Sequence, residues 1–202
     1  MKKTKVLILG NDPQINDIDF DRLDPSIITL GVNRIWLKYI PNYFFFHDWD
    51  IVHELNQNPE TLAKLRENST IFSSDWYRFN KKPIPAWLRL LDRPRSKKSN
   101  FPDSVTTSMW LFKNHYAEHL ECTYYIAGVS LKWQEPSHFW KTIPNYQTKN
   151  KFNSVWYNPR FAKTLQNFKA LDGARYRMIS VNSNSNLNKM MRHESIDTLY
   201  LK

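Results

Sequence analysis

Polar and ionisable side chains follow each of three successive apolar runs in the first quarter of the chain. The residues at these three ends are Gly10, Asn11, Asp12 and Pro13, then Asn33 and Arg34, then His47, Asp48 and Asp50. Glycine lets the backbone turn tightly against a phosphate, and a nearby side-chain amide can bond to a ribose or phosphate oxygen. Three such ends in a row favour a nucleotide site, although a plain β-turn uses the same residue types.

The elements that must position these residues follow from hydrophobic spacing. Short apolar runs predict strands over residues 4–10, 27–32, 42–47, 69–73, 122–129 and 175–182. Helical spacing predicts helices over residues 59–67, 104–120 and about 160–171. Alternating strands and helices predict an α/β fold with a Rossmann-like, doubly wound, mostly parallel sheet and a ligand at the carboxyl ends of the strands. The 202 residues fit a single domain, residues 1–202.

Two stretches without periodicity, about 78–103 and 132–158, are rich in Pro, Lys, Arg, Trp and Tyr. We predict long loops there, and loops of this length are uncommon unless they are functional. The net charge of +10 attracts polyanions, although a basic excess can also be merely solubilising.

Cations that follow phosphates and rings that stack on bases are typical of a nucleic-acid surface. The residues predicted to bind DNA in this way are Arg93, Arg95, Lys97, Lys98, Trp140, Trp156 and Arg160. Rings also stack on sugars, so a glycan acceptor would explain the tryptophans and leave the charge unexplained. Alternatively, the rings fill a core beneath the loops.

Cysteine and histidine usage indicates a cytoplasmic protein without a metal. Cys122 has no partner for a disulfide, and the N-terminus has too few apolar residues for a signal peptide or a membrane span, so no membrane insertion is expected. His115 and His119 lie four apart on a predicted helix, but no third ligand is near them in the sequence.

The segments "KVLILGNDPQINDIDFDRLDPSIITLGVNRIWL", "YFFFHDWD", "SVTTSMW", "YYIAGVSL" and "RYRMISVNSNSNL" together resemble the family 42 bacterial sialyltransferases and their phage-encoded relatives. The resemblance is spread over most of the chain, and no single motif is long. It implies a Rossmann-type glycosyltransferase that takes a nucleotide-sugar donor, CMP-sialic acid in the characterised members, and needs no metal. For this chain we expect a CMP- or UDP-linked donor.

The resemblance also assigns donor-binding residues. Those that match the family are Gly10, Asn11, Pro13, Asn33, Thr106, Thr107 and Gly128, and Asp48 stands where the family has a further asparagine. Three positions depart from the family pattern: Asp12 and Ser108 replace glycines, and Ser130 replaces an aspartate. The segment "VWYNPRF" contains no histidine where the family has its catalytic one. A changed donor and lost catalysis are the two interpretations.

If the chain is active, another base must take the proton of the acceptor hydroxyl. Asp48, Asp50 and His47 are the catalytic candidates by position, and His138 on the second loop is a further one. Alternatively, His47 is a half-buried structural histidine and Asp50 caps a helix.

The function predicted from these features is a phage-type glycosyltransferase, acting in the host cytoplasm, that adds a sugar to a hydroxymethylated pyrimidine in DNA. The fold and the donor follow from the resemblance, whereas the DNA acceptor follows from charge and loop composition. The alternatives are sialyltransferase-like transfer to a surface glycan, and a degenerate protein that binds nucleotide or nucleic acid without turnover.

Overall fold

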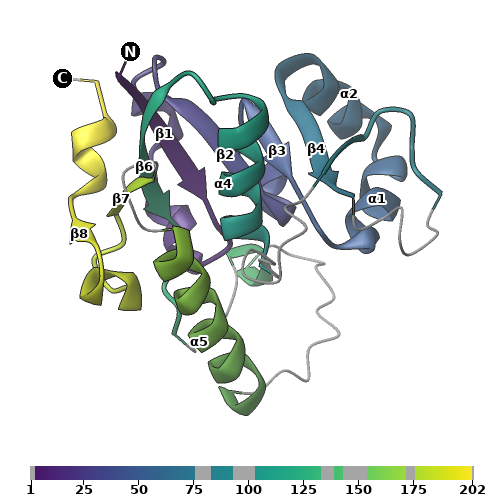
Figure 1. Cartoon of the computed structure of the whole chain (residues 1–202). Helices are drawn as coiled ribbons and strands as arrows, with labels where there is room; N and C mark the ends of the chain where they lie inside the picture. Colours follow the sequence, from purple (N-terminus) through teal and green to yellow (C-terminus); the bar gives the residue numbers. More distant parts are fainter. Residues whose placement is uncertain are drawn as a thin grey trace.

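The computed structural model describes residues 3–75, 83–92, 103–132, 139–142, 154–171 and 176–201; at 141–142 and 154–161 it describes the backbone alone. Within these residues one eight-stranded sheet has the order β5-β4-β3-β2-β1-β6-β7-β8, and all neighbouring strands are parallel. Helices cover both faces of the sheet (Figure 1). The predicted Rossmann-like α/β fold is therefore confirmed.

The strands are β1 (Lys3–Leu9), β2 (Ile28–Val32), β3 (Tyr43–Phe45), β4 (Thr70–Ser74), β5 (Arg89–Leu91), β6 (Glu121–Ala127), β7 (Arg177–Ser180) and β8 (Arg192–His193). The α-helices are α1 (Trp49–Asn56), α2 (Pro59–Asn68), α4 (Ser104–His115) and α5 (Ser154–Leu171). The 3-10 helices are η1 (Pro13–Asp17), η2 (Phe20–Arg22), η3 (Asn33–Leu37), η5 (Phe139–Thr142), η6 (Asn186–Lys189) and η7 (Ile196–Leu199).

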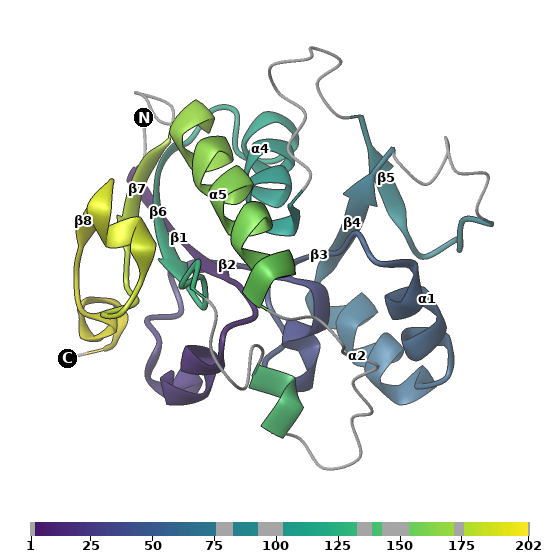
Figure 2. The ribbon, with the colours of Figure 1, turned by 90° about the horizontal axis from the view of Figure 1, so that it is seen from below.

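The central strand β1 is apolar on both sides because it separates two hydrophobic layers. Val6 and Ile8 pack in the layer formed with α4 and α5, whereas Leu7 and Leu9 pack in the layer formed with η1, α1, α2 and η5. Figure 2 shows α4 and α5 on one side of the sheet and α1 and α2 on the other. All four side chains are fully buried, which explains the uninterrupted apolar run in the sequence.

The register of the sheet places the predicted site residues at one edge. Leu9 pairs with Gly31 of β2 on one side and with Ala127 of β6 on the other, and Val32 of β2 pairs with Phe45 of β3. The polar residues that follow these strands consequently emerge next to one another at the carboxyl edge.

Several elements differ from the predicted ones. Each stretch predicted as a long loop contains regular structure: β5 lies in the first, and η5 and the start of α5 lie in the second. Helix α5 begins at Ser154 rather than near residue 160. The sequence pattern also predicts no strand at β8, which is only two residues long.

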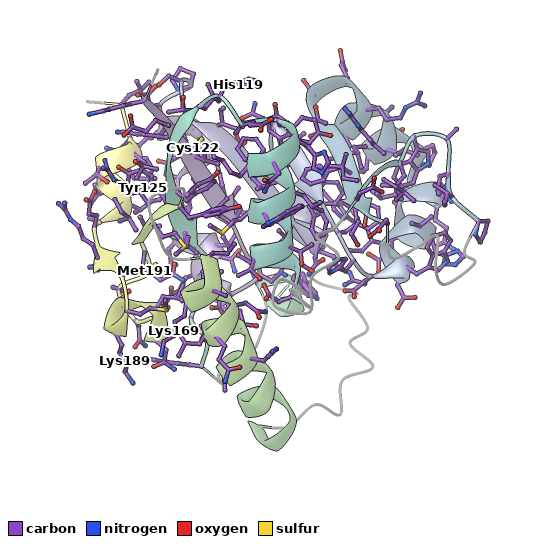
Figure 3. All side chains as sticks on the ribbon, in the orientation of Figure 1. His119, Cys122, Tyr125, Lys169, Lys189 and Met191 are labelled. Carbon is purple, nitrogen blue, oxygen red and sulfur yellow. The ribbon has the colours of Figure 1, made fainter. Side chains whose placement is uncertain are left out.

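None of the helices among the described residues is both long enough and apolar enough to cross a membrane. The cytoplasmic location stays a prediction. Cys122 is buried on β6, where Figure 3 shows it within the body of the protein.

Candidate functional site

The order of the strands changes direction between β1 and β6. From β1 the chain passes to β2 on one side, and it later returns through β6 on the other side. In open α/β sheets a ligand binds in the crevice outside such a switch point, at the carboxyl ends of the strands. The strand order therefore predicts a ligand site at the turns after β1 and β6.

Hydrogen bonds join these two turns directly. The Gly10 amide donates to the Ala127 carbonyl over 2.8 Å, and the Asp12 amide donates to the Gly128 carbonyl over 3.0 Å. The Ser130 amide in turn donates to the carboxylate of Asp12. The aspartate that replaces a family glycine is thus part of the link between the turns, and Ser130 takes part through its backbone.

The two glycines allow this close approach. A Cβ atom on Gly10 would lie 2.2 Å from the Gly128 carbonyl oxygen, which is far inside van der Waals contact. Gly128 has a φ of +66°, in the left-handed region that favours glycine, and a Cβ there would lie 2.6 Å from the Ile15 side chain. Both positions require glycine for backbone reasons in this structure.

Asn11 presents a buried hydrogen-bond acceptor at this edge. Its Oδ1 is buried and has no hydrogen-bond partner within the part of the chain that the structure describes. Its backbone carbonyl accepts a hydrogen bond from the Phe139 amide over 2.9 Å, which holds η5 against the turn. A buried acceptor without a partner costs free energy, and a donor group of a bound ligand would satisfy it.

Asn33 links the end of β2 to the start of α4. It has a φ of +53°, a conformation that asparagine adopts more readily than most residues. Its Oδ1 accepts a hydrogen bond from the Ser104 hydroxyl over 3.1 Å. Ser104 is therefore a further residue of this edge, which the sequence motifs do not identify.

The residue that caps α4 is Asp103. The Asp103 carboxylate accepts hydrogen bonds from the Thr106 amide, at 2.8 Å, and from the Thr106 hydroxyl. It also accepts one from Asn167 Nδ2 over 2.6 Å, which ties α5 to α4. Burial raises the pKa of the Asp103 carboxyl above its ordinary value, against the opposing effect of these donors.

Thr106 and Thr107, predicted to bind the donor, lie inside the start of α4. Their exposed fractions are 0% and 3%, and both amides donate to Asp103, that of Thr107 to the backbone carbonyl. The structure thus brings Gly10, Asn11, Asn33 and Gly128 together and gives the threonines a role in the helix cap. Pro13 opens η1 directly after the β1 turn.

The three catalytic candidates follow β3 but differ in environment. His47 is partly buried, its Nε2 lies 3.2 Å from the Ser74 hydroxyl, and its ring packs edge-on against Phe45. Asp48 occupies the N-cap position of α1 without a side-chain capping bond, and it is exposed. Asp50, predicted as a possible cap, lies two residues further on, exposed in the first turn of the helix.

Arg34, which follows Asn33, forms a partly buried ion pair that the sequence does not reveal. Its guanidinium Nη2 lies 2.5 Å from Glu54 Oε1, and its Nε bonds to both carboxylate oxygens. The same guanidinium lies over the Trp140 ring, with 5.6 Å between its carbon and the ring centroid. The positive charge of Arg34 and the negative charge of Glu54 therefore compensate each other near the carboxyl edge of the sheet.

The residues predicted to bind DNA are only partly described. Trp140 is 5% exposed and packs in the core against Arg34, so its ring is not available for base stacking in this structure. The other predicted DNA contacts lie outside the described residues or side chains: Arg93, Arg95, Lys97, Lys98, Trp156 and Arg160. His138 also lies outside them.

Among the described residues, no group of three or more His, Cys, Asp and Glu side chains could hold a metal ion. His115 Nε2 lies 3.3 Å from the Asp92 carbonyl. Figure 3 shows His119 at the end of the molecule opposite the carboxyl edge of β1, so it cannot take part in the candidate site.

Neither a protein-family model nor a curated protein sequence matches the chain. Solved structures do match, and the class that they represent is the bacterial sialyltransferases. At the identities found the likeness establishes the fold, so the resemblance to family 42 is confirmed at that level.

Two of the matching structures are of the sialyltransferase CstII from Campylobacter jejuni. The one in complex with cytidine-5'-monophosphate is 12% identical, has a TM-score of 0.54, and covers 98% of this chain and 87% of that chain. The one with the substrate analogue CMP-3FNeuAc is 14% identical, has a TM-score of 0.51, and covers 98% and 89%. The α-2,3-sialyltransferase Cst-I from the same organism is 13% identical, has a TM-score of 0.54, and covers 99% and 83%.

Proposed function

We propose that this chain is a nucleotide-sugar-dependent glycosyltransferase of the sialyltransferase type, with a CMP-linked donor and a glycan hydroxyl as acceptor. The observation that carries the proposal is the pair of joined turns after β1 and β6, because it lies at the switch point of a fold shared with sialyltransferases that have been solved with CMP and a CMP-sugar analogue. A nucleotide bound there would lie against backbone rather than bulky side chains.

The donor contacts follow from the groups that the edge offers. Asn11 Oδ1 is a buried acceptor and suits an amino or hydroxyl group of the nucleoside. Asn33 belongs to the adjacent strand end and is held in place by Ser104. The Asp12 carboxylate accepts a hydrogen bond from the Ser130 amide. This bond joins the two turns through residues of the chain itself, so it does not require a bound donor.

Asp48 is the group that we assign as general base. It is exposed at the end of β3, adjacent to the β2 end that carries Asn33, whereas His47 is packed between Ser74 and Phe45. The acceptor oxygen forms a bond to the anomeric carbon as the bond from that carbon to the phosphate oxygen breaks. CMP leaves with the electron pair of that bond, and the hydroxyl proton passes to the Asp48 carboxylate.

A glycan acceptor is favoured over DNA because no observation on the described residues supports the DNA surface. The one described tryptophan of that set, Trp140, is buried in the core. The net charge and the composition of the two loops are then the remaining support for the DNA acceptor, and positive charge attracts any polyanion. The DNA acceptor and the phage origin stay predictions.

A thermal-shift comparison of CMP, UDP, UDP-glucose and CMP-sialic acid tests the proposed donor. We expect saturable stabilisation by CMP and CMP-sialic acid, since a ligand that binds only the folded state raises the melting temperature. Asn11→Ala and Asn33→Ala should each lose this stabilisation and keep the unliganded melting temperature within a few degrees. Asn184→Ala, at an exposed position outside the site, is the control.

Equal stabilisation by all four compounds would contradict the donor assignment, and so would unchanged CMP stabilisation in both asparagine variants. Stabilisation by UDP-glucose alone would keep the glycosyltransferase class and replace the CMP-linked donor with a UDP-linked one.

A further inference from the structure

A pocket borders the joined turns, under the carboxyl ends of β6, β7 and β8, and Ala127 at the end of β6 is part of its wall. Its volume is about 260 Å³, and it is lined by η1 and by the chain that follows β7 and β8. The polar residues that line it are Gln14, Asp17, Asn182, Ser183, His193 and Ser195.

Asn182 supplies a buried donor without a hydrogen-bond partner among the described residues. Its side chain is 5% exposed, and its Nδ2 forms no hydrogen bond within the described part of the chain. The orientation of the amide is fixed, because Oδ1 accepts a hydrogen bond from the Gly128 amide over 3.0 Å and the other atom must therefore be the NH₂ group. A donor of this kind next to a pocket is costly unless something in the pocket accepts from it.

Gln14 supplies the complementary group. Its Oε1 is buried and likewise has no hydrogen-bond partner among the described residues. The pocket thus combines an unpaired donor with an unpaired acceptor, and both come from amides. Apolar side chains, among them Ile18 and Ile196, form other parts of the wall.

The size and charge of the pocket limit what it can hold. Pockets for drug-sized ligands have volumes of about 300–1,000 Å³, so this one is too small for a whole nucleotide sugar. No lysine or arginine is among its described lining residues, and Asp17 is, so the described wall offers a phosphate or carboxylate group no permanently charged cation.

We propose that this pocket binds a neutral N-acetylhexosamine unit. An acetamido group offers a carbonyl, which only accepts, for Asn182 Nδ2, and an N–H, which only donates, for Gln14 Oε1. Its methyl group and the sugar C–H face suit the isoleucines, and the serine hydroxyls suit the sugar hydroxyls. Because it rests on the proposed function, this assignment makes the pocket an anchoring subsite for the acceptor glycan.

NMR titration of the full chain with N-acetylglucosamine, N-acetylgalactosamine, glucose and galactose tests the proposal. We expect saturable binding of the two acetamido sugars with a Kd of about 1 mM, as expected for a ligand of this size, and at least roughly tenfold weaker binding of the other two. The Asn182 side-chain NH₂ resonances should move during the titration.

Asn182→Asp is the decisive variant. A carboxylate at this position can still accept from the Gly128 amide, but it presents an acceptor, not a donor, to the sugar carbonyl. We expect at least a tenfold loss of N-acetylglucosamine affinity with CMP stabilisation retained. Asn184→Asp makes the same chemical change two residues away, where Oδ1 accepts from Lys132 Nζ outside the pocket, and should bind the sugar as the wild type does. Ser183→Trp, at the exposed rim, should block the pocket if Asn182→Asp does not fold.

The proposal is overturned if no acetamido sugar binds at tens of millimolar, in which case ordered water satisfies the two amides. It is also overturned if Asn182→Asp or Ser183→Trp binds like the wild type, or if glucose binds as well as N-acetylglucosamine. CMP binding is measured on the same samples. Sugar binding that depends on Asn182, without CMP binding, would support the sugar pocket and contradict the proposed glycosyltransferase function. CMP binding without sugar binding would contradict the sugar pocket and leave the proposed glycosyltransferase function standing.

Discussion

Replacing Asp48 with asparagine is expected to lower the rate of sugar transfer by about 10²–10⁴-fold, the usual contribution of a general base, while CMP binding stays unchanged. Asparagine has nearly the same shape but cannot take the proton of the acceptor hydroxyl. It is also as favourable as aspartate at the N-cap position that Asp48 occupies, so α1 should remain stable. The measurement is the steady-state release of CMP from CMP-sialic acid in the presence of a galactoside acceptor.

Asp50→Asn is the matched control, because it removes a carboxylate of the same type two residues further along, inside the first turn of α1. We expect its rate to stay within about twofold of the wild type, as is usual for an exposed position away from the reaction. The assignment of Asp48 is wrong if the Asp48 variant keeps more than about a tenth of the wild-type rate, and a large loss in the Asp50 variant alone would transfer the role to Asp50.

Replacing Gly10 with alanine should destabilise the protein by about 3 kcal/mol, at the upper end of the usual range for overpacking. The added Cβ would lie 2.2 Å from the Gly128 carbonyl oxygen and 2.6 Å from a Val129 methyl group, so the two joined turns must separate. CMP stabilisation should disappear as well, because the donor edge consists of these turns. Urea unfolding with and without CMP measures both effects.

Gly31→Ala is the comparison for this variant. A Cβ at Gly31 would meet side-chain atoms of Ile35 and Pro41, at 2.4 and 2.9 Å, and these can adjust more readily than backbone. We expect a smaller loss of stability and retained CMP binding. If Gly10→Ala were as stable as the wild type and still bound CMP, the turns would not be packed as described.

The strands of the sheet were predictable where they are long and buried on both faces. β1 and β6 have seven residues each and read as continuous apolar runs, as central parallel strands do. β5 and β8 have three and two residues, which is too short for any periodicity to appear. They add to the sheet edges through pairing with strands that were themselves predicted.

The early start of α5 was hidden by Pro159. Proline is common in the first turn of helices and rare in the interior, so the segment reads as a helix that begins just after it. In the structure α5 already begins at Ser154 and includes this proline. Local propensity therefore predicts a later start of α5 than the structure shows.

The position of the candidate site residues at one edge of the sheet was predictable, whereas the hydrogen bonds between them were not. Gly10, Asn11, Asn33 and Gly128 were assigned through the resemblance, and the register of the sheet brings them to one edge. The bonds from Ser130 to Asp12 and from Ser104 to Asn33 join residues 118 and 71 positions apart. No local sequence pattern predicts such a contact. The ion pair of Arg34 with Glu54 and the pocket at Asn182 likewise depend on residues far apart in the sequence.

Binding of a CMP-linked donor at the joined turns after β1 and β6 can be observed residue by residue in a ¹H–¹⁵N NMR titration of the chain with CMP. We expect saturable shifts of the Gly10, Asn11 and Gly128 amides and of the Asn11 side-chain NH₂ group, while amides at the opposite edge, such as that of His119, stay unchanged. Saturable shifts confined to residues away from these turns, or no saturable shifts at all, would contradict binding there.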